Sequence, residues 1–184
     1  MAQKTNFEAI KAEILNRAKA AQACIEQYRR AYKSETLQEL CSIIKDNFHW
    51  CFNNKVITSD LLIRYRKDFA QNDIFINISV RCGFLLCSNA TVKALGNVTV
   101  EACDNATVEA CDNATVEAWG NATVKAWDNA KVKAYGNTTV EAYGNVYCTS
   151  CRIIECKLSN NAIYRVKSTN TVYYSSDNIN FIKQ

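Results

Sequence analysis

Residues 89–144 are seven consecutive octapeptides, and this repeat constrains the fold more than any other feature of the chain. Asparagine at position one, valine at position four and alanine at position six are the same in all seven copies. Residues 113–120, which read Asn-Ala-Thr-Val-Glu-Ala-Trp-Gly, illustrate the motif. A fixed short period is typical of a solenoid, in which each repeat packs on its neighbours.

Side chains alternate in character along each octad, which predicts one short strand per repeat. Positions two, four and six are mostly alanine, valine and alanine. Positions three, five and seven are mostly threonine, a charge, and an aromatic residue or cysteine. Successive side chains of a strand point to opposite faces, so the small apolar set is expected inside. The Gly–Asn or Asp–Asn pair between octads then forms a corner, because these residues tolerate a positive φ.

The thin alanine–valine–alanine interior favours two octads per coil. A triangular coil of three octads would leave a central space that one valine per strand cannot fill, and protein interiors tolerate voids poorly. The charges at position five fit either arrangement and leave the choice open. Stacked coils lie about 4.8 Å apart, so equivalent positions are expected to form ladders of threonine, charged, aromatic and asparagine side chains.

The segments before the octads predict a small helical module followed by a capping coil. Apolar residues recur at spacings of three and four over residues 5–32, which predicts one long amphipathic helix, and two shorter helices follow it. From Asp73 the period changes to two. The predicted fold class is therefore α+β, with a helical module over residues 1–72 and a β-solenoid with capping coils over residues 73–184.

The alternation also predicts which flanking side chains close the solenoid interior. Before the octads, the expected inward residues are Ile74, Ile76, Ile78, Cys82, Phe84 and Leu86. After them, the expected inward residues are Cys148, Ile154, Cys156, Leu158, Tyr164 and Val166. Larger residues than alanine suit terminal coils, which must exclude water. Residues 169–184 are expected to cap the far end.

Composition argues for a cytoplasmic protein. The N-terminus lacks the apolar run of a signal peptide, and no segment is long and apolar enough to span a bilayer. Ten cysteines without a secretion signal are expected to be reduced thiols. A net charge of +4 is too mild to predict binding to nucleic acid.

Two features could carry chemistry, and each has a simpler structural interpretation. Cys148 and Cys151 form a C-x-x-C motif, but the octad phase places them on opposite faces of a strand. His49 is the only histidine; Cys51 or Cys41 could partner it in a dyad, but the sequence arranges no third group. We therefore expect no catalytic residue, no metal site and no cofactor, so the chain is predicted not to be an enzyme.

The outward aromatic residues at position seven are the most distinctive candidate surface. Aromatic residues exposed in a row often mark a protein contact, although they can also stack on one another and stiffen the rod. Charges at position five lie beside them. The predicted partner-contact residues are Trp119, Trp127, Tyr135, Tyr143, Glu117, Lys125, Lys133 and Glu141.

The octad run resembles octapeptide-repeat proteins of gut Bacteroidetes and of their phages and mobile elements. Residues 37–50, the following Cys51, and the lead-in over residues 75–87 also resemble the flank that precedes such repeats. The resemblance covers most of the chain. It implies a β-solenoid protein in the cytosol of a bacterium or of a phage-infected host, and it carries over no activity and no catalytic residue.

The sequence therefore predicts a non-enzymatic protein-interaction module whose partner is another protein. Given the resemblance, a role in inhibiting or modulating a bacterial defence protein is one hypothesis. A homodimer could form through a stripe of Ile14, Ala21 and Tyr28 on the N-terminal helix. The alternative is a self-assembling rod or fibre component. Ice binding is disfavoured because a Glu or Lys follows two residues after nearly every repeat threonine.

Overall fold

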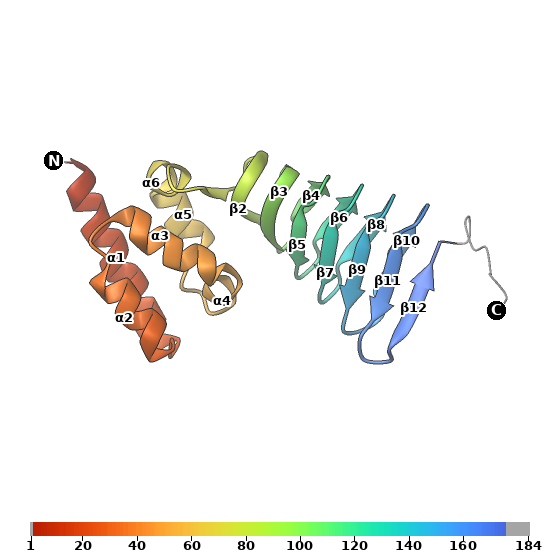
Figure 1. Ribbon diagram of the computed structural model, residues 1–184, viewed down its shortest axis with the longest axis horizontal. Helices are drawn as coiled ribbons and strands as arrows, with labels where there is room; N and C mark the ends of the chain where they lie inside the picture. The colour runs from red at the N-terminus through yellow and green to blue at the C-terminus, as the bar shows by residue number, and fades with distance from the viewer. Residues whose placement is uncertain (1, 176–184) are drawn as a thin grey trace. The chain divides into compact units, whose positions relative to one another are not determined.

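The computed structural model describes residues 2–175, which fall into two compact units divided between Ile76 and Asn77. The sequence predicts this boundary slightly earlier, between residues 72 and 73. The first unit contains the helices and one short strand, and the second contains the stacked strands (Figure 1). The predicted fold class, a helical module followed by a β-solenoid, is confirmed.

Six helices and strand β1 make up the described part of the first unit. Thr36 caps the third helix by accepting a hydrogen bond from Glu39 N at 3.2 Å, and Thr58 caps the fifth by accepting one from Leu61 N at 3.4 Å. The elements are α1 Ala2–Ala20, α2 Ile25–Lys33, α3 Leu37–Asp46, α4 Phe48–Asn53, α5 Ser59–Arg64, α6 Arg66–Ala70 and β1 Ile74–Ile76.

The first helical region is interrupted, so the prediction of one helix over residues 5–32 was wrong. Gln22 adopts a φ of 55°, which ends α1. Ala23 N donates to Ala18 O at 2.9 Å and Gln22 N donates to Lys19 O at 3.1 Å, the hydrogen bonds of a Schellman cap. That position is usually glycine or asparagine, and the sequence offers neither, so no stop signal was visible.

The second unit is a β-solenoid with two octads per coil, as predicted. Each strand of the repeat pairs in parallel with the strand two octads further on, for example Val108 with Val124 and Val116 with Val132. The strands are β2 Val80–Ser88, β3 Thr91–Cys103, β4 Thr107–Ala110, β5 Thr115–Ala118, β6 Thr123–Ala126, β7 Lys131–Ala134, β8 Thr139–Ala142, β9 Tyr147–Ser150, β10 Cys156–Leu158, β11 Ile163–Val166 and β12 Thr171–Tyr174.

The coils present two faces. We name β4, β6, β8 and β10 the even sheet, and β5, β7, β9 and β11 the odd sheet. Strand β3 joins both, because its first half pairs with β4 and its second half with β5. Figure 1 shows the strands of each sheet stacked one after another along the solenoid.

The corners form as the sequence predicted. Position eight takes a positive φ, whether it is glycine, as in Gly120 at 68°, or aspartate, as in Asp112 at 59°. Position one builds the asparagine ladder: Asn121 Nδ2 donates to Asn105 Oδ1 at 3.4 Å, and Asn113 Nδ2 donates to Asn97 Oδ1 at 3.3 Å on the other corner. Each corner is therefore held to the next coil by a side-chain amide.

The interior is filled by the small apolar set. Val108, Val116 and Val124 are fully buried between the two sheets. Burying a valine side chain contributes about 1.5–3 kcal/mol, and each added coil buries two such valines, one from each sheet. Thr138 replaces an inward alanine, and its hydroxyl donates to Tyr135 O at 2.6 Å, which satisfies the buried polar group.

The N-terminal coil departs from the predicted phase. Leu85 pairs with Val100, which is one residue short of the two-octad spacing, so Leu85 and Cys87 occupy the inward places. One residue fewer in this coil reverses the alternation. The predicted inward register of Cys82, Phe84 and Leu86 was therefore wrong, although Leu86, which aligns with Glu101, is fully buried.

The strand that precedes this coil keeps its alternation only briefly. Ile74 and Ile76 are buried, as expected, whereas Ile78 is 39% exposed. Asn77, with a φ of 52°, turns the chain and ends the alternation before Ile78 is reached.

Tyr164 closes the C-terminal end of the solenoid. It aligns with Cys148 in the neighbouring coil and is buried, as predicted. Its hydroxyl shares a 2.7 Å hydrogen bond with Ser150 Oγ and accepts one from Ile154 N at 3.0 Å. Its ring stacks on Tyr173 of the antiparallel strand β12 with centroids 5.6 Å apart. Of residues 169–184, which were expected to cap this end, 176–184 lie outside the described part.

Candidate functional site

The predicted aromatic residues form two separate ladders, one on each sheet. Trp119 and Tyr135 stack on the odd sheet with ring centroids 3.9 Å apart and planes inclined by 7°. Trp127 and Tyr143 stack on the even sheet with centroids 5.6 Å apart and planes inclined by 13°. A coil of two octads requires this separation, because equivalent residues of consecutive octads lie on opposite sheets.

Stacking changes what these side chains offer to a partner. All four rings are half-buried rather than exposed. Each ring places one face against its neighbour in the next coil, so that face is not available for a contact. The rings therefore stack between coils, and the surface that they leave for a partner is smaller than the sequence suggested.

The position-five charges form ladders beside the aromatic rings. On the even sheet, Lys93 Nζ lies 2.8 Å from Glu109 Oε2, and Lys125 Nζ lies 3.6 Å from Glu141 Oε2. On the odd sheet, Lys133 Nζ lies 2.7 Å from Glu117 Oε1. Opposite charges therefore neutralise one another along the even sheet, whereas at position five of the odd sheet Glu101 and Glu117 outnumber the single lysine, Lys133.

The odd sheet also places two acidic residues in adjacent coils. Glu101 and Glu117 align in register, and both are buried. Trp119 Nε1 donates to Glu101 Oε2 at 3.2 Å, and Lys133 pairs with Glu117. The tryptophan and the lysine thus offset the repulsion that the like-charge pair would otherwise cause.

A hydrogen bond within the even sheet links the charge ladder to the aromatic ladder. Tyr143 Oη donates to Glu141 Oε2 at 2.7 Å. This hydrogen bond, helped by the nearby charge of Lys125, lowers the pKa of Glu141 from its usual 4.5. The same bond raises the pKa of Tyr143. The predicted residues on this sheet are therefore coupled to one another.

The eight predicted contact residues do not form one surface. Trp127, Tyr143, Lys125 and Glu141 lie on or beside the even sheet. Trp119, Tyr135, Glu117 and Lys133 lie on or beside the odd sheet. A partner that docks on one sheet would touch only four of them.

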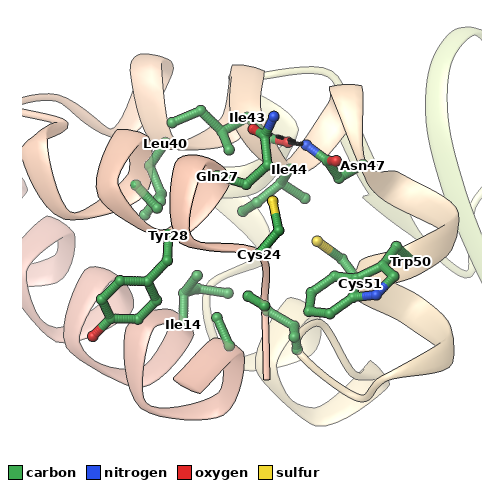
Figure 2. Close-up of a pocket in the computed structure, with 14 residues that line it drawn as sticks. Ile14, Cys24, Gln27, Tyr28, Leu40, Ile43, Ile44, Asn47, Trp50 and Cys51 are labelled. Atoms are coloured by element: carbon green, nitrogen blue, oxygen red, sulfur yellow. Dashed lines mark hydrogen bonds between the residues drawn. The ribbon is translucent and has the colours of Figure 1, made fainter. Parts of the chain in front are cut away.

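The helical unit contains an apolar hollow that the sequence did not indicate. Its volume is about 180 Å³, and α1, α2, α3 and α4 contribute to its walls (Figure 2). Ile14, Leu40 and Ile44 supply apolar surface, and the side chains of Cys24 and Cys51 border the same space. Gln27 and Asn47 form a weak polar contact at its edge, with Nδ2 of Asn47 3.5 Å from Oε1 of Gln27.

A groove adjoins the hollow and shares Ala23 and Tyr28 with it. Ile25 is 69% exposed and Tyr32 is 65% exposed along this groove. We name the patch of Ile25, Tyr28, Tyr32, Lys19 and Arg29 the α2 surface. Large apolar side chains that lie together in the open are typical of contact surfaces.

The break at Gln22 explains why this surface was missed. A continuous helix over residues 5–32 would have placed Ile25 and Tyr32 on the same buried stripe as Ile14. In the structure Ile14 is 2% exposed in the core of the helical unit, whereas α2 turns Ile25 and Tyr32 outward. Ile14 is thus unavailable to the expected dimer stripe; dimerisation itself stays a prediction.

The cysteine and histidine candidates show no arrangement for nucleophilic catalysis within the described residues. Cys148 is buried in β9, whereas Cys151 is exposed and follows the end of that strand at Ser150. Burial raises the pKa of both Cys41 and Cys51 to about 12, so neither is a ready thiolate. Asn53 Nδ2 lies 3.0 Å from His49 Nε2.

Comparison with known protein families, with curated proteins and with solved structures found no match for this chain. The fold itself defines the class: a repeat protein with a parallel β-solenoid and an N-terminal helical unit. None of the helices in the described residues has the length and apolar character needed to cross a membrane.

Proposed function

We propose that this chain is a non-enzymatic protein-interaction module and that the α2 surface is its principal contact. The observation that carries the proposal is the pair of exposed apolar side chains, Ile25 and Tyr32, beside an apolar hollow. Leaving such residues in water lowers solubility, and a protein contact would bury them.

The dimensions of the hollow suit a side chain of the partner. A cavity of about 150 Å³ holds a benzene molecule, so 180 Å³ can accept one leucine or phenylalanine side chain. Tyr28 lines both the hollow and the groove, and Arg29 lines the groove; tyrosine and arginine often dominate binding energy. One buried anchor within a ring of such residues is a common arrangement at protein interfaces.

Charge favours an acidic partner segment. Helix α2 carries Arg29 and Lys33 against a single acidic residue, Glu26, while its third cation, Arg30, pairs with Asp46. Lys19 of α1 also lines the groove. We therefore propose a partner segment with acidic side chains around one or two apolar anchors, because complementary charges speed association and fix orientation.

The solenoid sheets are the rival contact surface. Their aromatic rings are stacked and most of their position-five charges are paired, which suits a stiff rod. We assign them the secondary role of a rigid spacer. Substitution of the aromatic residues on one sheet at a time detects binding through that sheet.

The resemblance of the octads to repeats of gut Bacteroidetes and of their phages supports a narrower proposal. On that basis the chain acts in the bacterial cytoplasm and inhibits or modulates a host protein, such as a defence effector. This role needs an interaction surface and no catalytic site.

Affinity capture with matched variants tests the proposal. The intact protein is compared with an α2-surface variant (Ile25→Ser, Tyr32→Ser), an even-sheet variant (Trp127→Ser, Tyr143→Ser) and an odd-sheet variant (Trp119→Ser, Tyr135→Ser). Ile63→Ser, at an isoleucine that is 50% exposed on α5, controls for general loss of surface apolarity. Circular dichroism establishes that each variant is folded.

We expect one bacterial protein to be captured by the intact chain, by both sheet variants and by Ile63→Ser, and to be lost with the α2-surface variant. Loss with one sheet variant only would move the contact to that sheet. Capture of no protein, together with filaments or large oligomers in solution, would favour the self-assembling rod instead.

A further inference from the structure

Two cysteines face each other across the coil that β9 and β10 form. Cys148 of β9 aligns with Val132, and Cys156 of β10 aligns with Val140. Both valines point into the interior from opposite sheets, so the two cysteines occupy the same central place one coil further on. The strand register therefore places the two side chains opposite each other in the interior.

The two thiols differ in access. Cys148 is fully buried, and Tyr164 covers it from the next coil. Cys156 is half-buried and lines a surface cavity of about 380 Å³ together with Ile153, Ile154 and Leu158. A small oxidant can therefore reach Cys156 first, with Cys148 directly behind it.

We propose that Cys148 and Cys156 are a peroxide-sensitive pair that closes to a disulfide across the solenoid interior. In the first step the Cys156 thiolate attacks hydrogen peroxide; the O–O bond breaks, Cys156 becomes a sulfenic acid and hydroxide leaves. In the second step the Cys148 sulfur attacks the Cys156 sulfur; the S–S bond forms and the S–O bond breaks. The oxygen leaves as water with the Cys148 proton, so two thiols are oxidised as peroxide is reduced to water.

The position of β10 allows the bridge to close. Among the described strands, β10 pairs with β8 alone and ends the even sheet, so it can shift toward β9 without breaking a ladder on its other side. The residues between the cysteines are held by Tyr164, whose hydroxyl contacts Ser150 and Ile154. The segment between the two cysteines is therefore held in place, whereas β10 itself can still move toward β9.

The pKa values of the two thiols shift in opposite directions, which indicates which thiol reacts with peroxide. The hydrogen bond from Cys148 lowers the pKa of Cys156, and the same bond together with burial raises the pKa of Cys148. Cys156 is thus the thiol that reacts with peroxide, and Cys148 is the thiol that resolves the sulfenic acid.

Peptide mapping of the full chain after peroxide treatment tests the proposal. Trypsin places Cys148 and Cys151 on the peptide 134–152 and Cys156 on the peptide 153–157. The matched variants are Cys148→Val and Cys156→Val, which install the residue that the repeat uses at that place, and Cys151→Ser, which removes the neighbouring exposed thiol. Thermal unfolding establishes that each variant is folded.

Wild type and Cys151→Ser are expected to give the two peptides joined, with the mass of two hydrogens lost and the link reversed by dithiothreitol. The bridge should also raise the melting temperature of both. Cys148→Val should leave a sulfenic acid on Cys156 that dimedone traps. A link that persists in Cys148→Val but disappears in Cys151→Ser would assign the bridge to Cys151 and overturn the proposal. Oxidation of exposed Cys24 and Cys82 without any link between the two peptides would also overturn it.

Discussion

Trp119 and Tyr135, which occupy position seven of octads in adjacent coils, stack with ring centroids 3.9 Å apart and planes inclined by 7°. The contact exists because β5 and β7 pair in parallel and in register, so position seven of one coil lies directly under position seven of the next. The repeat thus converts a single sequence position into a continuous ladder. A ladder of this kind is first a stabilising feature and only secondarily a contact surface.

Removing one ring of this pair should destabilise the solenoid. For Trp119→Ala we expect a loss of about 2 kcal/mol in the free energy of unfolding, from lost burial of a half-buried ring and lost stacking. The measurement is urea unfolding followed by circular dichroism, in a double-mutant cycle with Tyr135→Ala. A coupling energy within about 0.5 kcal/mol of zero would show that the rings act independently and would contradict the stacked ladder.

Gly96 is predicted to resist substitution more than Gly144, although both have a φ of 74°. An alanine Cβ at Gly96 would lie 2.7 Å from Arg81 O, closer than any normal contact, whereas at Gly144 the nearest atom would be 3.2 Å away. We expect Gly144→Ala to cost about 1 kcal/mol from backbone strain, and Gly96→Ala about 2 kcal/mol or more. Equal melting temperatures for Gly96→Ala and Gly144→Ala would contradict the close approach of Arg81 O to Gly96 in the N-terminal coil.

The Tyr143–Glu141 hydrogen bond should be visible as a pH dependence. Because the folded-state pKa of Glu141 is lowered, its contribution to stability is present above pH 4.5 and is lost as pH falls through the folded-state pKa. In Tyr143→Phe we expect the pKa of Glu141 to rise toward 4.5, as followed by NMR titration of its carboxyl group. Tyr135→Phe on the odd sheet is the control and should leave Glu141 unchanged; a shift of similar size there would refute the local explanation.

Thiol labelling in the native protein should separate the cysteines by burial. Cys24, Cys82 and Cys151 are exposed and are expected to react rapidly with iodoacetamide near neutral pH. Burial raises the pKa of Cys51 and Cys87 to about 12, so these thiols should react only on unfolding. Mass spectrometry of peptides from a time course reads out the order. Early labelling of Cys87 would indicate that the N-terminal coil is open.

Much of the solenoid could be predicted from the octad itself. An interior no wider than valine admits two facing sheets and not three, and the pairing of Val108 with Val124, two octads further on, confirms this. The asparagine ladder and the corners followed from the same repeat, because each position has one environment that recurs. The facing of Cys148 and Cys156 was also accessible, since both occupy position four of consecutive octads.

Where the repeat ends, prediction failed for identifiable reasons. The shortened spacing between Leu85 and Val100 leaves no trace in composition, yet it reverses which side chains point inward. The end of α1 depends on a positive φ at Gln22, a residue type that carries no such signal. Because the sequence did not predict that break, it also did not predict the exposure of Ile25 and Tyr32, on which the proposed function depends.

Site-specific photocrosslinking tests the proposed contact most directly. A photoreactive phenylalanine analogue replaces Tyr32 on the α2 surface, Ile63 on α5 or Trp127 on the even sheet, one at a time, in the full chain produced in a bacterial host. We expect a discrete covalent adduct with one host protein from position 32 and none from positions 63 and 127. An adduct from position 127 with none from position 32 would contradict this expectation and place the contact on the solenoid.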